Sequence, residues 1–416
     1  MRHALFLALL TAVAAPALAQ QRDAPAPGQT IVVTGVRIQD LRDRLAACLA
    51  RGCPPNEDID ATLALAEALF FEGEYHDART AVRASLSRNR RHVRAFPEPV
   101  SDLYRVNARL ARNLGLDRDA NHSTYEILRA LQAGIPVEDH RHFTARLEIV
   151  QALVAFGQYP EARRQLREVV ERADAAGRED IAAIAELRLI WIAYLQAPHS
   201  GAALRDLVAM SRSADQRRAT GARMLLVRIY SERGERRLAD AVMAELGRGS
   251  RSRQLLYNPP YELSQREERG RSDDRRDMAV AGTVALEGPN RVNSAHTALV
   301  TANLADRMTG NFDDKWIDVS FRISPEGRVE ELEVARQSAD PAWADPLLVS
   351  IRGRRYSAGD TATYRLERYT YTSGFQHNTT GTHIAARSAR ARVEYFDLSE
   401  GIAAPESAPA ARNSDN

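Results

Sequence analysis

The chain has 416 residues, of which 44% are hydrophobic and 27% are charged, and its formal net charge is +2. A chain of this length is expected to form two or three folded units, because one small core does not need so many residues. The balanced charge excludes the strong basic field of a nucleic-acid-binding protein, and the hydrophobic content is ordinary for a globular protein in water.

Residues 1–19 are typical of a cleaved export signal. A short polar start containing Arg2 precedes an apolar run over residues 4–15, which is too short to span a bilayer. The small-x-small pattern that ends at Ala19 matches a cleavage site. We therefore expect a mature protein in the periplasm, without a membrane span.

Residues 20–38 form a predicted flexible leader that contains one β-prone run. Ile31, Val32 and Val33 are uncharged and β-branched, and Gly35 ends the run. The run is consistent with a strand that binds another surface, with a plain N-terminal strand, or with a disordered segment.

The two cysteines, Cys48 and Cys53, are predicted to form a structural disulfide. An exported chain can oxidise them, and Gly52 ends the helical pattern that contains Cys48, so the chain can fold back and bring the sulfurs together. The spacing differs from the redox pattern C-x-x-C, and the chain has no second cysteine pair to complete a zinc site.

Residues 39–247 are predicted to be helical, because Ala and Leu recur at three- and four-residue spacing from Ile59 onward. A motif repeats in this region: a glycine between helices, with an alanine five residues later. The glycines are Gly73, Gly115, Gly157 and Gly234, and the alanines are Ala78, Ala120, Ala162 and Ala239. The first three glycines are 42 residues apart, and the gap before the fourth leaves room for a degenerate unit around residues 181–210.

A glycine between two helices and a small alanine in the second resemble tetratricopeptide repeats. The resemblance implies helix pairs stacked into a solenoid, whose concave surface would bind peptides or proteins. The alternative is a plain helical array that only spaces the C-terminal domain.

A linker is predicted over residues 248–290, because Pro259-Pro260 cannot continue a helix and a run of charged residues follows. The next unit, residues 291–399, is predicted to be a small α+β domain, and residues 400–416 a disordered tail. The expected elements of the α+β domain are a helix over 294–307, a strand over 316–323, a strand from 329 that has a bulge near its start or begins late, a helix from 345 to 352, a strand over 363–373 and a further strand candidate over 391–399.

This order resembles the C-terminal domain of the TonB energy transducers over about residues 291–373. The shared pattern is Gly327 in a turn, Arg328-Val329 opening the next strand, a short helix at 346–351 and an arginine-rich segment ending at Tyr356. An unrelated α+β domain built by the same packing rules is the alternative. The chain lacks the uncleaved membrane helix and the Pro-rich spacer of that family, which argues against direct energy transduction.

The resemblance implies that the last strand binds an extended partner strand. The residues expected to do so are Tyr364, Leu366, Tyr369 and Tyr371. The run Ile31, Val32 and Val33 resembles the TonB box that such domains bind, so a TonB-dependent outer-membrane receptor is an expected partner. This run could also fill the same edge in cis or in a neighbouring copy of the chain.

The sequence contains no phosphate loop, nucleophile elbow, zinc-protease motif or dinucleotide fingerprint, so we expect a non-enzymatic protein without a cofactor or metal. The histidine-containing stretch from Glu138 to His142 is interpreted as a helix start. We therefore expect an exported adaptor of the cell envelope. The alternative is a periplasmic scaffold that binds partners through the helical-repeat groove, with no link to TonB-dependent transport.

Overall fold

The computed structural model describes residues 37–246, 253–259, 300–301, 315–338, 341–377 and 385–399. The predicted export signal, the leader with Ile31, Val32 and Val33, most of the predicted linker and the tail lie outside these residues.

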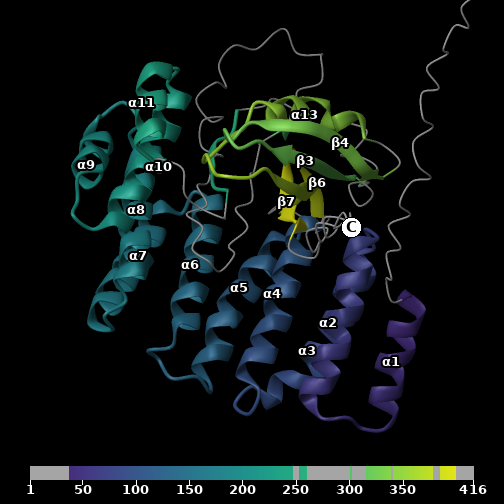
Figure 1. Cartoon of the computed structure of the whole chain (residues 1–416). Coiled ribbons are helices and arrows are strands. Elements are labelled where there is room, and N and C mark those ends of the chain that lie inside the picture. Colours follow the sequence, from purple (N-terminus) through teal and green to yellow (C-terminus); the bar gives the residue numbers. More distant parts are fainter. Residues whose placement is uncertain are drawn as a thin grey trace, which may run out of the picture.

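Eleven α-helices fill the described region between residues 38 and 246 and stand side by side as a curved array (Figure 1). Consecutive helices pack against one another. The helices are α1 Ile38–Ala50, α2 Pro55–Phe71, α3 Tyr75–Asn89, α4 Pro97–Asn113, α5 Asp117–Gln132, α6 His140–Ala155, α7 Tyr159–Ala175, α8 Glu179–Gln196, α9 Ala202–Met210, α10 Gln216–Glu232 and α11 Arg236–Leu246.

The predicted glycine turns are confirmed. Gly73, Gly115, Gly157 and Gly234 each join the two helices of a pair with φ between 69° and 83°, a left-handed conformation that glycine adopts without steric cost. The alanines five residues later are buried where the paired helices touch. The degenerate unit also exists, as the pair α8 and α9. Since a helix pair cannot bury its apolar face alone, the pairs stack into a solenoid.

The C-terminal region forms a five-stranded sheet in the order β2-β7-β6-β3-β4, with antiparallel neighbours, and a separate two-stranded pair of β1 with β5. In Figure 1 this sheet lies over the ends of α2 and α4, and α13 covers its far side. The strands are β1 Leu255–Tyr257, β2 Val300–Thr301, β3 Trp316–Ile323, β4 Val329–Gln337, β5 Arg355–Tyr356, β6 Thr363–His377 and β7 Ala385–Asp397, and the helix α13 is Asp345–Arg352.

The predicted hairpin, short helix and following strand are present as β3, β4, α13 and β6. The turn uses Gly327 at φ 80°, and the expected bulge in β4 lies at Glu331, whose φ is 51°. The further strand candidate forms the second half of β7. The helix predicted over residues 294–307 is wrong at Val300 and Thr301, which pair with β7; these β-branched residues follow the sheet, and the rest of that segment lies outside the described residues.

Two apolar cores fix the sheet in place. One lies between the sheet and α13 and includes Ile317, Phe321 and Leu347. The other belongs mainly to α2, α3 and α4, yet Leu398, directly after β7, is part of it, and Phe396 of β7 packs against it. The sheet therefore buries both faces, one against its own helix and one against the solenoid.

Candidate functional site

The strand β6 does not have the open edge that the sequence predicts. It pairs with β3 over Thr363–Thr370 and with β7 over Glu367–His377, so its residues 367–370 are paired on both sides. The backbone groups of an interior strand are already used, and a partner strand cannot add there. This corrects the prediction of a partner-binding edge, because the chain itself returns as β7 and occupies that position.

The four residues expected at that edge have other environments. Tyr369 and Tyr371 are buried in the core beneath α13, and Leu366 packs against the solenoid core. Only Tyr364 projects outward, with 66% of its surface exposed. The set therefore does not form one binding surface.

The outer position on this side of the described sheet belongs to β4, which carries features that discourage strand addition. Glu330, Glu331 and Glu333 place three carboxylates along the strand, and Arg322 of β3 pairs with the first two. The bulge at Glu331 also interrupts the regular backbone. Charges and bulges on an edge strand oppose pairing with another chain.

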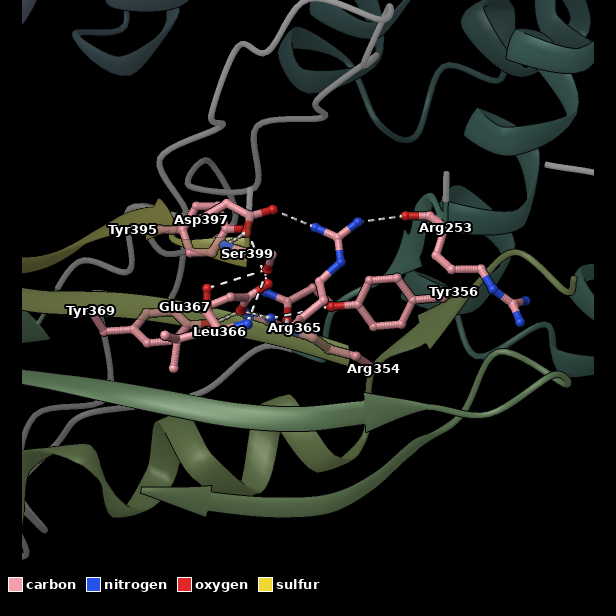
Figure 2. Close-up of polar contacts among 11 residues, drawn as sticks. Arg253, Arg354, Tyr356, Arg365, Leu366, Glu367, Tyr369, Tyr395, Asp397 and Ser399 are labelled. Carbon is pink, nitrogen blue, oxygen red and sulfur yellow. Dashed lines mark hydrogen bonds and ion pairs between the residues drawn. The ribbon is translucent and has the colours of Figure 1, made fainter. Parts of the chain in front are cut away.

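A buried cluster of charged and phenolic groups connects the strands β5, β6 and β7 (Figure 2). The Glu367 carboxylate accepts from Arg354 Nη1 at 2.7 Å, from the Tyr395 hydroxyl at 3.0 Å and from the Tyr369 hydroxyl. Burial raises the pKa of Tyr369 and of Tyr395 well above the usual value of 10, so both phenols stay protonated as donors. Both carboxylate oxygens are occupied by neighbouring side chains, which is the arrangement of a structural ion pair.

Arginines of the sheet also bind the ends of the solenoid helices. Arg368 donates to the carbonyls of Phe70 and Phe71, the last residues of α2, and its guanidinium lies 4.1 Å from the centre of the Trp316 ring. Asp318 holds the same guanidinium at 2.6 Å and 2.8 Å. The carbonyls at a helix C-terminus have no intrahelical donors and carry partial negative charge, so a cation there is favourable.

A second contact of this kind lies one helix pair further along. Arg392 of β7 donates to the Arg112 carbonyl at 3.1 Å and binds both oxygens of Asp117, at 2.6 Å and 3.1 Å. Gly374 lies against the same carboxylate, where an added Cβ would stand 2.3 Å from an Asp117 oxygen. These contacts hold the sheet at a defined position on the solenoid.

Beside this second contact lies a cavity of about 130 Å³ between α4, α5, α6 and β7. Its walls therefore come from two helix pairs and from the sheet. The residues that define its chemistry are Arg105, Arg109, Asn113, Asn121, Glu148, Phe156, Arg392 and Phe396.

The cavity combines charges of both signs with aromatic surface. Arg105 and Glu148 form an ion pair at 3.1 Å across α4 and α6, and the Arg109 guanidinium lies 4.2 Å from the centre of the Phe396 ring. Phe156, directly after α6, has 41% of its surface exposed. Such a mixed lining suits a ligand that has both polar groups and apolar side chains.

The stretch from Glu138 to His142 begins α6, as predicted. Asp139 caps the helix by accepting the Arg141 N–H at 2.9 Å, and the hydrogen bonds from Arg141 hold the pKa of this carboxyl well below its usual value. The His142 ring lies 3.2 Å from the Ile135 carbonyl. The residues serve as a cap and a turn anchor.

The predicted disulfide between Cys48 and Cys53 is confirmed, with the two Cα atoms 5.2 Å apart. It closes the turn between α1 and α2, the first two helices of the solenoid (Figure 1), whereas the cavity is lined by α4, α5 and α6. Its place at a turn agrees with a structural role.

Sequence reasoning missed the cavity. Its residues come from positions 105–156 and 392–396, and nothing local indicates that these segments meet. One signal was available in β7. Its alternate residues Arg392, Glu394 and Phe396 are large and either charged or aromatic, a pattern typical of a strand face that packs against a polar surface.

Within the described ranges, no helix combines the length and the apolarity needed to cross a bilayer. No protein-family model matches the chain, and no curated protein matches it.

Among solved structures, the chain is similar to BtubC (BKLC) from P. vanneervenii, with 16% identity, a TM-score of 0.38 and coverage of 52% of this chain and 94% of that one. It is also similar to the apo form of RapI, with 12% identity, a TM-score of 0.39 and coverage of 50% of this chain and 57% of that one. A third similar structure is a Rap protein complexed with Competence and Sporulation Factor, with 11% identity, a TM-score of 0.34 and coverage of 49% of this chain and 57% of that one. At these identities and scores, no property of the three proteins transfers to this chain.

Proposed function

We propose that this chain is an exported, non-enzymatic scaffold that binds an extended segment of a partner protein in the groove between α4, α5, α6 and β7. The observation that carries the proposal is the cavity of about 130 Å³ at this position, whose walls join the solenoid to the sheet. The proposed setting in the periplasm is based on the export-signal pattern of residues 1–19.

An extended peptide fits the chemistry of this groove. Its backbone needs donors and acceptors, and the amides of Asn113 and Asn121 make no hydrogen bond to any residue that the structure describes, so they can supply both. An apolar side chain of the peptide can pack on Phe156, and the surface of Arg109 and Phe396 gives a second contact.

The pairing of the ionisable groups supports a binding role over catalysis. Arg105 and Glu148 neutralise each other in the groove, and Arg392 is bound to Asp117 and Glu394. A catalytic acid or base needs access to substrate and a pKa suited to proton transfer. These pairs instead offer a fixed pattern of charge that selects a partner.

The closed edge of β6 favours one of the two roles weighed from the sequence. Strand addition at β6 would require the loss of its pairs with β7. The solenoid groove needs no such rearrangement, and we therefore favour groove binding over capture of a TonB box by β6.

A peptide-display selection on the immobilised full chain tests this proposal. Enriched peptides are then measured against the variants Phe156→Arg, in the groove, and Tyr125→Arg, on α5 outside it; the two aromatic residues have similar exposure, 41% and 38%. We expect the first variant to weaken binding at least tenfold and the second to leave it unchanged. Equal binding to both variants, or the absence of enriched peptides, contradicts the proposal.

A further inference from the structure

Arg188 of α8 is a half-buried guanidinium without a carboxylate. Its Nη1 donates to the Leu147 carbonyl of α6 at 3.3 Å, and its Nε is closed off from solvent with no hydrogen-bond partner. Within the described ranges, no Asp or Glu side chain lies within ion-pair distance of it. A charged group in this position lacks the compensation that buried charges normally have.

The neighbouring arginines show how unusual this is. Arg146 of α6 pairs with Glu168 at 3.1 Å, and Arg218 of α10 pairs with Glu186 at 2.7 Å. Arg228 of α10 pairs with Glu232 at 2.8 Å. In each of these three pairs the chain supplies a carboxylate to a partly buried arginine, from α7, from α8 itself and from α10. Arg188 is left without one in the part of the chain that the structure describes.

Burial also acts on the charge itself. It lowers the pKa of Arg188 to about 10, with no nearby carboxylate to raise it again. The group is still a cation at neutral pH, but it has lost part of its hydration. An anion that binds it regains the lost interaction, and the planar guanidinium favours a carboxylate, which can accept two parallel hydrogen bonds.

The position of Arg188 connects it to the proposed groove. The carbonyl that it contacts belongs to Leu147, and the next residue, Glu148, lines the groove. The helices α6 and α8 are in contact. Packed helices are about 8 to 10 Å apart, and the chain from Leu147 to Phe156 rises about 13 Å along α6. The two points are therefore roughly 16 Å apart, a distance that about five residues of extended chain cover.

Resting on the proposed function, we propose that Arg188 binds a carboxylate of the partner segment, about five residues from the residue that packs on Phe156. The partner class is therefore an extended peptide with an Asp, a Glu or its own C-terminal carboxylate at that spacing from an apolar residue. The apolar residue lies on Phe156, and the carboxylate crosses α6 to reach the guanidinium.

The experiment uses the same peptide selection, carried out on the full chain and on Arg188→Gln. We expect the unchanged chain to enrich Asp or Glu at one position and the variant to lose that preference. A synthetic peptide from the selection is then compared with its Glu→Gln counterpart. The change should weaken binding about tenfold on the unchanged chain and leave binding to Arg188→Gln unaffected.

Two further variants complete the design. Arg188→Lys keeps the charge but not the planar fork, and should give an intermediate loss. Arg167→Gln removes an exposed arginine of α7 and should change nothing. If the Gln-containing peptide binds Arg188→Gln as tightly as it binds the unchanged chain, this variant is folded.

The outcomes separate the two proposals. Peptides that depend on Phe156 but show no acidic position, or keep their acidic preference on Arg188→Gln, overturn the role of Arg188 and leave groove binding intact. If no peptide depends on Phe156, groove binding fails and the role of Arg188 fails with it.

Discussion

The sheet and the solenoid both bury arginines, but they surround them differently. In the sheet, Arg354 is enclosed by Glu367, Asn258 and Tyr356, and Arg368 is enclosed by Asp318 and two helix-end carbonyls. In the solenoid, Arg188 has one long hydrogen bond to a carbonyl.

The difference separates two uses of the same side chain. A guanidinium that pairs with a carboxylate of the chain holds segments together, and removing it leaves that carboxylate uncompensated. A guanidinium without an anionic partner in the chain does not stabilise the fold in this way, and it can bind an anionic group of another molecule. The free energy of unfolding of arginine variants tests this distinction, and the largest loss is expected where a buried carboxylate loses its guanidinium.

Arg354→Met should have the largest effect. The change leaves the Glu367 carboxylate buried with only two phenols as donors. We expect a loss of about 3 to 5 kcal/mol in the free energy of unfolding, measured by chemical denaturation. Arg51→Met removes an exposed ion pair with Glu57 and should cause no measurable loss. Similar losses of unfolding free energy in both variants would contradict a structural role of the buried pair of Arg354 and Glu367.

Arg368→Met should lower the free energy of unfolding by about 3 kcal/mol. The loss is smaller than for Arg354→Met because Arg336 still binds Asp318 at 3.1 Å. The variant should also increase hydrogen exchange at the turn around Gly73, which the sheet no longer holds. Arg336→Met, at a site that is 43% exposed, is the matched control and should have the smaller effect on both measurements. If the two variants ranked in the opposite order, the sheet would be held mainly by Arg336.

Tyr356 should make the sheet sensitive to alkali. Burial and the nearby Glu367 charge raise the pKa of its phenol to about 12, against about 10 in the unfolded chain. The folded state therefore keeps its full stability below pH 10 and loses up to about 2.7 kcal/mol as the pH rises towards 12.

Tyr356→Phe should reduce this loss in denaturation experiments at pH 9 and pH 11. Tyr364→Phe, at an exposed site, is the control and should leave the loss unchanged. A pH dependence that is identical in Tyr356→Phe and the parent chain would contradict the assignment.

Arg188→Met should have the smallest effect, and it should be a gain. The change removes a half-buried charge without a carboxylate and fills the space with an apolar chain of similar length. We expect the free energy of unfolding to rise by about 1 kcal/mol in the absence of any ligand. A loss as large as that of Arg354→Met would place Arg188 among the structural arginines.

The parts of the fold that repeat or alternate were predictable from the sequence. Gly73, Gly115 and Gly157 mark turns because a left-handed backbone needs glycine, and Ile317 and Phe321 mark a strand because its side chains alternate. The neighbour of β6 was not predictable in this way. Strand pairing depends on long-range competition between segments, and the alternation of β7 was visible only from residue 391 onward.

The candidate site was less accessible to sequence reasoning than the fold. Arg188 looks like any arginine in a helix, and its distinction is the lack of a carboxylate among residues that come from other helices. The cavity likewise exists only after the sheet has docked on α4 and α5. Both features arise from the packing of distant segments, which local patterns do not encode.

The arginines that fasten the sheet to α2 reach main-chain oxygens, those of Phe70 and Phe71. Every amino acid carries such an oxygen, so these hydrogen bonds depend on the path of the main chain and not on which side chains stand at the two positions. A substitution at Phe71 would therefore leave these hydrogen bonds in place, whereas inserting or deleting one residue there would move the oxygens away from the guanidinium groups and release the sheet.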